Sequence, residues 1–228
     1  MKGLSIVSSS GLQVGDEVIA IGNPHGLVGS LTTGIVSALG RSEQADFTSN
    51  FSIADLIQTS TPINPGNSGG PLLNALGEVV WITNSIVSNS QGVGFAVPSS
   101  DILRELPSLV STGLYTKHSY LGVEVEDVSY DLAQQEHVSV TYGVWIPSDI
   151  GQAAIVPNGP SAGKLQGGDV IIAINGTRIL NGDGLASYLG ENALLGDLAV
   201  ISVVRNGADI TVELGHSSTH RFLVFPFP

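Results

Sequence analysis

Short apolar runs separated by glycine, proline and asparagine turns dominate the first part of the chain. Their length and their content of valine, isoleucine and threonine are typical of β-strands; the runs cover residues 14–22, 31–39, 56–59, 78–82 and 94–99. Between them, the polar and acidic residues 41–55 predict a surface loop, and residues 88–92 predict a turn. The pattern therefore predicts a β-rich first region over residues 1–99.

A helical pattern follows this region. Ser99-Ser100-Asp101 comes before Ile102, Leu103 and Leu106, which predicts a helix that begins at a serine or aspartate cap. Pro107 predicts an interruption or a new turn, and the continuation should end at Gly113. We expect residues 100–117 to connect two domains.

The remaining sequence again has a strand and turn pattern. Residues 170–174 lead into Asn175-Gly176, and the runs 198–204 and 209–214 flank Asn206-Gly207, so both pairs are expected at hairpin turns. Residues 183–190 predict a helix. We assign residues 118–215 to a second domain and residues 216–228 to a hydrophobic tail.

Composition limits the classes of partner. The 228 residues suffice for two domains, and 20 acidic against 8 basic residues give a net charge of −12. This charge argues against nucleic acid or an anionic membrane as the main partner. No apolar run reaches 18 residues, which argues against a membrane span. There are no cysteines and no metal-ligand spacing of histidine and carboxylates, so we expect no metal and no cofactor.

The segment Asn64-Pro65-Gly66-Asn67-Ser68-Gly69-Gly70-Pro71-Leu72 carries the strongest chemical signal. A serine flanked by glycines can lie on a tight exposed turn, where backbone N–H groups approach a developing oxyanion without obstruction by a Cβ. This predicts Ser68 as a nucleophile, with the N–H groups of Gly66 and Ser68 around Asn67 as the oxyanion hole. The alternative is a glycine-rich turn with no chemistry.

With Ile57-Gln58-Thr59 before it, this segment resembles the HtrA (DegP-type) branch of trypsin-like serine proteases. The resemblance implies that residues 1–99 form the second β-barrel of a trypsin fold. It also implies a triad histidine and aspartate before the serine, on the first barrel. Only His25 precedes Ser68, and its position makes it a loop residue. We therefore expect the chain alone to be inactive, and its Met1 leaves open whether the sequence starts natively.

Two positions depart from or refine this resemblance. Trp81 stands where the family usually has glycine, so its indole either packs in the core or crowds the substrate pocket. Pro62, six residues before Ser68, stands where trypsin sets its charge preference. A proline supplies no carboxylate, which predicts an apolar primary pocket.

In the second domain, Tyr120-Leu121-Gly122-Val123 resembles the carboxylate-binding loop of a PDZ domain. Residues 159–176 are similar to the PDZ pattern of Ala-Gly-Leu, Gly-Asp and Asn-Gly, although a generic β-sandwich is the alternative. The resemblance implies that Tyr120, Leu121, Gly122 and Val123 bind the C-terminus of a peptide beside the sheet edge.

Two functions remain open. One is an endopeptidase that acts on unfolded proteins, and the other is a non-catalytic peptide-binding and self-assembling protein. We expect self-association, with Trp81 and residues 25–35 near the contact, because an isolated second barrel exposes apolar surface. The tail could occupy the peptide site. The sequence fixes no location, although the family is often extracytoplasmic.

Overall fold

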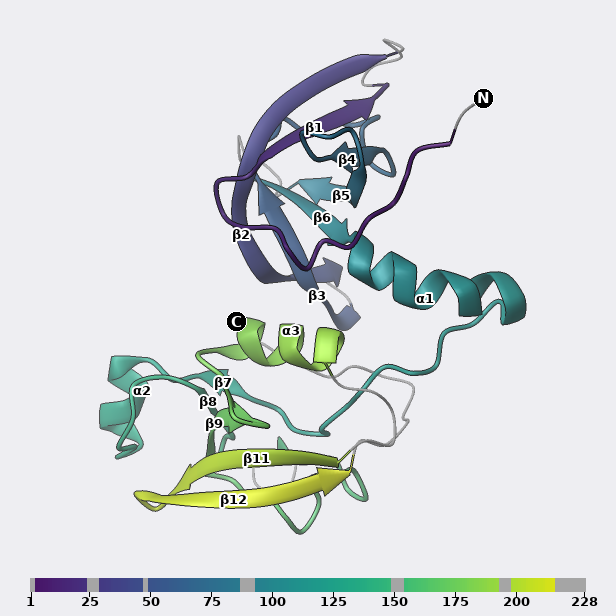
Figure 1. Cartoon of the computed structure of the whole chain (residues 1–228). Coiled ribbons are helices and arrows are strands. Elements are labelled where there is room, and N and C mark those ends of the chain that lie inside the picture. The colour runs from purple at the N-terminus through teal and green to yellow at the C-terminus, as the bar shows by residue number, and fades with distance from the viewer. Residues whose placement is uncertain are drawn as a thin grey trace. The chain divides into compact units, whose positions relative to one another are not determined.

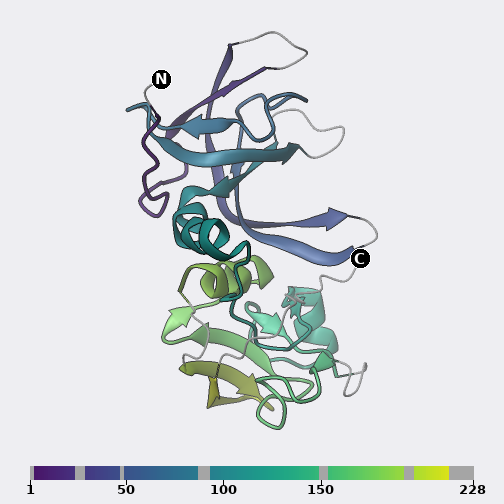
Figure 2. The same ribbon diagram turned by 90° about the vertical axis from the view of Figure 1, so that its right-hand side faces the viewer.

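The computed structural model describes residues 3–23, 29–46, 49–86, 93–148, 154–192 and 198–215. The chain divides into two compact units (Figures 1 and 2). The first unit contains residues Met1–Arg41 and Asp55–Tyr115, and the second contains Ser42–Ala54 and Thr116–Pro228.

The first unit is built on a closed barrel of six strands (Figure 1). Around the barrel the order is β1-β2-β3-β6-β5-β4, and the neighbouring pairs with a described register are antiparallel. The strands are β1 Glu17–Gly22, β2 Ser30–Asp46, β3 Ser49–Thr59, β4 Pro71–Leu73, β5 Val79–Ile86 and β6 Gly94–Pro98. This confirms the mainly β, barrel-based architecture expected for the first region.

Alternation of side chains along the strands fills the barrel. On β1, Val18 and Ala20 point inward and are each 1% exposed, and they pack in a cluster with Leu72 and Trp81. Trp81 is fully buried. The core interpretation of this tryptophan is therefore confirmed. Its expected place near or in a self-association contact stays a prediction.

The prediction of a surface loop over residues 41–55 is wrong. The strands β2 and β3 continue through most of this stretch and form a long hairpin (Figure 2). Polar sequence concealed the strands because backbone pairing in an extended hairpin does not require an apolar face. The turn predicted at residues 88–92 lies outside the described residues.

Helix α1, Ser99–Thr112, differs from its prediction in two respects. It runs through Pro107 without interruption. Its own residues provide no side-chain cap: the Ser99 hydroxyl donates to the Val7 carbonyl at 2.5 Å, and the Ser100 N–H donates to the Ser9 hydroxyl at 3.2 Å. A distant segment thus caps the helix. Its predicted end is confirmed, since Gly113 has φ +74° and its N–H donates to the Leu109 carbonyl.

The second unit contains a sheet in the order β12-β11-β9-β8-β7, with β10 paired to β9. Its strands are β7 Glu126–Asp127, β8 Val144–Trp145, β9 Val170–Ile174, β10 Thr177–Arg178, β11 Leu198–Arg205 and β12 Ala208–Gly215. Helix α2, Tyr130–Gln135, was not predicted, and α3 spans Gly182–Asn192. An apolar core that includes Leu121, Ile146 and Leu185 lies between α3 and the sheet. Helix α2 packs through Ala133 in a second cluster with Trp145 and Val170.

Both asparagine-glycine turns are confirmed. Asn175 and Gly176 have φ of +48° and +80° between β9 and β10, and Asn206 and Gly207 have +51° and +76° between β11 and β12. These left-handed pairs are typical of the tight hairpin turn whose twist matches the flanking strands. Beside this hairpin, Arg205 contacts the fully buried Asp169 carboxylate through two hydrogen bonds of 2.6 and 2.7 Å.

Candidate functional site

Ser68 lies on the turn that connects β3 to β4. Its residue is exposed, whereas the neighbouring Asn67 is only 2% exposed. The turn is closed by two backbone bonds of 2.9 Å each, from the Asn67 N–H to the Asn64 carbonyl and from the Gly70 N–H to the Asn67 carbonyl. The chain therefore buries one side of the loop and leaves the serine on the other.

Glycine is required at several positions of this loop. Gly66 and Gly69 have φ of +104° and +80°, in the left-handed region where other residues are strained. At Gly70, a Cβ would lie 2.6 Å from the Ile21 carbonyl oxygen, so the loop backbone packs directly on β1. These constraints explain why the serine has glycine neighbours.

Thr83 on β5 holds the serine loop through backbone and side-chain hydrogen bonds. The Gly69 N–H donates to the Thr83 carbonyl at 2.7 Å, and the Thr83 N–H donates to the Gly70 carbonyl at 3.0 Å. The Thr83 hydroxyl also contacts the carbonyls of Asn67 and Gly70. Sequence reasoning missed this residue, although its place two positions after Trp81 in a strand beside the motif was a usable signal.

Asn67 points into the protein rather than toward substrate. Its side-chain nitrogen donates to the Pro62 carbonyl at 3.4 Å, and its buried Oδ1 has no hydrogen-bond partner in the described part of the chain. The Gly66 carbonyl accepts from the Asn23 N–H at 3.1 Å. Within the described residues, the Gly66 and Ser68 N–H groups donate to no acceptor in the chain, so both are available to a bound oxygen atom.

The predicted pocket position lies next to this loop. Pro62 is exposed, and its carbonyl also accepts from the Thr32 hydroxyl at 3.0 Å. The adjacent Ile63 is buried against Gly94, where a Cβ would lie 2.6 Å from the isoleucine Cδ1. An apolar residue therefore lies beside Pro62. His25 lies outside the described residues, and the Ser68 hydroxyl has no hydrogen-bond partner among those that are described.

In the second unit, the Tyr120–Val123 segment is held by the residues around Pro160. Gly122 has φ +75°, and a Cβ there would lie 3.2 Å from the Tyr120 ring and 3.3 Å from Pro160. The Leu121 carbonyl accepts from both the N–H and the hydroxyl of the buried Ser161, at 3.2 and 2.7 Å. Burial raises the pKa of the Tyr120 hydroxyl. The segment thus has a fixed backbone.

This segment continues through an isolated antiparallel bridge into the short strand β7, and it is paired on one side. The Glu124 N–H donates to the Ala154 carbonyl at 2.7 Å, and the Val156 N–H donates to the Gly122 carbonyl at 2.9 Å. Val123 forms an antiparallel bridge with Ile155. Because successive backbone groups point to opposite sides of a strand, those of Val123 and Val125 point toward the other edge.

Helix α3 is tied to both ends of this strand. At one end, the Ser119 hydroxyl donates to the Leu189 carbonyl at 2.8 Å. At the other end, the Gly182 N–H donates to the Asp127 carboxylate at 2.6 Å. Sequence reasoning missed Ser119, Asp127 and Ser161, since their roles depend on partners distant in the chain.

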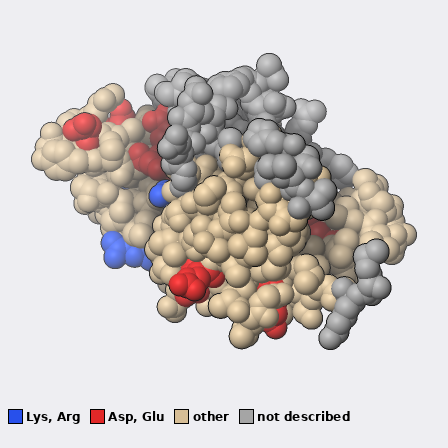
Figure 3. Space-filling model, turned by 90° about the horizontal axis from the view of Figure 1, so that it is seen from above, with Lys and Arg blue, Asp and Glu red and all other residues tan. Residues whose placement is uncertain are grey.

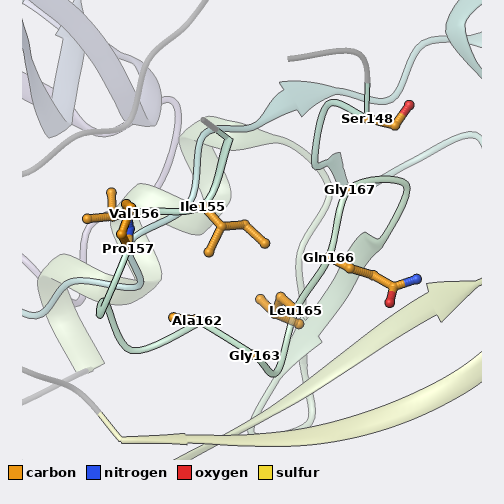
Figure 4. A pocket seen from close by; sticks show the side chains of 9 residues that line it. All are labelled: Ser148, Ile155, Val156, Pro157, Ala162, Gly163, Leu165, Gln166 and Gly167. Atoms are coloured by element: carbon orange, nitrogen blue, oxygen red, sulfur yellow. The ribbon is translucent and has the colours of Figure 1, made fainter. Parts of the chain in front are cut away.

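A separate pocket of about 550 Å³ lies in the same unit (Figure 4). Apolar side chains such as Ile155 and Leu165 point into it, with Gln166 and Ser148 at one side. Neither the Tyr120–Val123 segment nor α3 lines it. This pocket is therefore distinct from the predicted peptide site.

Charged side chains are few and scattered on the face drawn in Figure 3. Among the described residues, no cluster of histidine and carboxylate side chains could hold a metal ion. No helix in the same part of the chain is long and apolar enough to cross a membrane.

Comparison with known proteins agrees with both units. A trypsin-like peptidase domain model matches residues 2–82, and a PDZ domain model matches residues 119–215. The putative serine protease HhoA of Synechocystis sp. is 41% identical over 191 residues, which are 82% of this chain and 48% of the relative. A probable periplasmic serine endoprotease, DegP-like, of Pseudomonas fluorescens is 39% identical over 92% of this chain and 42% of its own length.

Solved structures show the same relationship. The HtrA-type protease AlgW with a tripeptide has a TM-score of 0.70 and 31% identity over 96% of this chain and 70% of that one. AlgW with a decapeptide has a TM-score of 0.68 and 32% identity, over 96% and 65%. The fold and the serine loop define a trypsin-like serine protease unit followed by a PDZ domain. The chain belongs to the HtrA (DegP-like) family, and it spans less than half the length of these curated relatives.

Proposed function

We propose that this chain supplies the nucleophile and a peptide-binding module to an HtrA-like serine endopeptidase that acts on unfolded or exposed protein segments. The observation that carries the proposal is the exposed Ser68 on a loop fixed by Gly66, Gly69 and Thr83. The Gly66 and Ser68 N–H groups, which donate to no described acceptor, suit an oxyanion that develops on the substrate.

In this reaction the Ser68 Oγ attacks the substrate carbonyl carbon, and a base takes the hydroxyl proton. The carbonyl oxygen becomes the oxyanion that the two N–H groups stabilise. His25 is the only histidine before Ser68 among the 228 residues. We assign it to a loop rather than to the triad, so these residues by themselves leave Ser68 unactivated. The histidine and aspartate must then come from outside them.

A serine-directed fluorophosphonate and unfolded casein test this assignment. The purified 228-residue chain should show negligible labelling and cleavage. Robust labelling that disappears in Ser68→Ala would refute the unactivated state. The endopeptidase role is tested in cells that make the protein from its own gene: protein recovered from them should cleave casein, Ser68→Ala should abolish cleavage, and Gly11→Ala should not. Equal cleavage by the Ser68→Ala protein would refute the role.

The primary pocket should accept apolar side chains. Pro62 and the buried Ile63 offer no negative charge beside the serine loop. With active protein, peptide substrates that carry valine before the cleaved bond should therefore be cut faster than matched arginine substrates. Faster cleavage of the arginine substrates would contradict this.

A second candidate function is peptide binding without catalysis. It is favoured by the fixed Tyr120–Val123 segment and by the strand edge at Val123 and Val125. A peptide could add a strand there, with its terminal carboxylate on the N–H groups of Leu121, Gly122 and Val123. The solved relative AlgW was obtained with peptides. Labelled peptides with a free C-terminal carboxylate should bind more tightly than their amides, and equal binding would refute the carboxylate site.

Self-association is a further part of the proposal. On the outside of the barrel, Ile21 lies directly opposite Leu31, and these side chains are 37% and 58% exposed. Ile35 on the same face of β2 is 41% exposed. We expect this face to make the contact. A monodisperse monomer in light scattering at micromolar concentration would contradict it. Since relatives carry periplasmic in their names, an extracytoplasmic location is also proposed, and cell fractionation tests it.

A further inference from the structure

Two glutamates accompany the strand edge of the second unit. Glu124 and Glu126 alternate with Val123 and Val125, which are 6% and 4% exposed in the core. Side chains alternate between the faces of a strand, so both glutamates lie on the face opposite to this core. Within the part of the chain that the structure describes, neither glutamate forms an ion pair.

The backbone around these glutamates shows which edge a ligand could use. The Glu124 N–H donates to Ala154, and Glu126 pairs with Trp145 of β8. The even-numbered residues thus use their backbone groups within the sheet. Val123 and Val125 direct theirs to the opposite edge. A peptide that adds to this edge can pair with these two residues.

The position of the carboxylate loop fixes the register of such a peptide. With its carboxylate at Leu121–Val123, the last residue of an antiparallel peptide lies opposite Val123. Its second-last residue then lies opposite Glu124, and its fourth-last residue lies opposite Glu126. Residues directly opposite in antiparallel strands have side chains on the same face and close enough to interact.

We propose that Glu124 and Glu126 select C-terminal peptides that carry lysine or arginine at the second-last and fourth-last positions. This inference rests on the proposed peptide-binding function and names its preferred ligand. Cationic side chains at these positions would pair with the two carboxylates, whereas acidic side chains would be repelled. The last residue of the peptide remains hydrophobic, because its side chain shares the face of the buried Val123.

The electrostatics of the glutamates support this preference. Partial burial, and secondarily the negative charge of Glu126, raise the pKa of the Glu124 carboxyl. The charged form of Glu124 is therefore disfavoured, without compensation from a described cation. A basic ligand side chain supplies that compensation, and the whole chain has only 8 basic residues against 20 acidic ones.

Fluorescence anisotropy with labelled ten-residue peptides tests the proposal. Peptides that end in valine, leucine or phenylalanine carry alanine, lysine or glutamate at the second-last and fourth-last positions, and each has a C-terminally amidated control. The proteins are the parent chain, Glu124→Gln, Glu126→Gln and the double variant. Glu213→Gln is the matched control, because this exposed glutamate lies on β12, at the opposite end of the strand order from β7.

The parent should bind the lysine peptides about two- to five-fold more tightly per position than the alanine peptides, and the glutamate peptides more weakly. Glu124→Gln should lose the lysine preference at the second-last position, and Glu126→Gln should lose it at the fourth-last position. Both variants should bind the alanine peptides as the parent does, and Glu213→Gln should keep both preferences. Equal affinity for lysine and alanine peptides, or a lysine preference that survives in the double variant, would overturn the inference alone. If none of the carboxylate-ended peptides binds better than its amide, the peptide-binding function itself fails, and this inference with it.

Discussion

Replacing Gly22 with alanine tests how closely β1 supports the loop that carries Ser68. An added Cβ would lie 2.2 Å from the Asn67 Oδ1, 2.8 Å from its Cγ and 2.9 Å from its Cα. Rotation of the amide can relieve the first two overlaps. It cannot relieve the third, so the backbone next to Ser68 must move. The substitution therefore reaches the loop without touching the serine.

The expected cost follows from these overlaps. Overpacking in a tight core costs about 1–3 kcal/mol. Alanine has less conformational entropy than glycine in the unfolded chain, which offsets about 0.4–1 kcal/mol of this cost. The φ of Gly22 is not in the left-handed region, so no backbone strain is added. We expect a loss of about 1–2 kcal/mol in the free energy of unfolding of the first unit. For a unit of about 100 residues, this lowers Tm by roughly 4–15 °C.

Urea unfolding followed by tryptophan fluorescence measures this loss. The chain has two tryptophans, one in each unit, and a Trp145→Phe background leaves Trp81 in the barrel as the reporter. This background is needed because two units need not unfold in a single transition. The midpoint for Gly22→Ala should fall while the slope of the transition stays constant.

Gly11→Ala is the matched control, since a Cβ there meets nothing within 4 Å and its φ is not positive. It should leave the midpoint unchanged or raise it slightly. Adding Asn67→Ala to Gly22→Ala removes the Oδ1 and Cγ overlaps and should restore part of the stability. If Gly22→Ala is as stable as the parent, or no less stable than Gly11→Ala, then the close contact between β1 and the loop does not exist.

Three other perturbations have defined outcomes. Trp81→Ala should lower the free energy of unfolding of the barrel by about 3–5 kcal/mol, measured by circular dichroism, because the indole is fully buried. Trp81→Phe should cost less, because it removes an Nε1–H that has no acceptor. An alanine variant as stable as the parent would refute this. Arg205→Met should lower the free energy of unfolding of the second unit by about 3 kcal/mol, because it leaves the charge of the buried Asp169 carboxylate unpaired. Urea unfolding followed by Trp145 fluorescence measures this loss, and a loss below about 1 kcal/mol would refute the prediction. Because the folded-state pKa of Glu124 is raised, its charge weakens the fold as pH rises through that pKa, the reverse of a salt-bridged glutamate. Glu124→Gln should therefore exceed the parent in stability at pH 7, by less than about 1 kcal/mol, and the difference should vanish below pH 4; a difference that grows on acidification would contradict the sign.

Local signals in the sequence determined much of the fold. Asn175-Gly176 and Asn206-Gly207 specified their hairpin turns because asparagine and glycine tolerate the left-handed φ values that those turns require. Gly113 ended α1 for the same reason. The spacing of glycines around Ser68 likewise indicated a tight loop, since Gly66 and Gly69 have positive φ. Each of these features depends on a few consecutive residues.

Contacts between distant residues decided the remainder, and no local pattern encodes them. Ser9 and Val7 accept hydrogen bonds from the first residues of α1, in place of a cap from the helix itself. The hairpin of β2 and β3 is held by backbone pairing that its polar sequence does not reveal. At the two sites, the position of Thr83 under the serine loop and the bond between Ser119 and Leu189 arise only when strands and helices pack. The sequence by itself determined where the two tight hairpin turns, the end of α1 and the serine loop lie. The tertiary structure decided which partners hold them, because a hydrogen bond across tens of residues depends on the folded path of the whole chain.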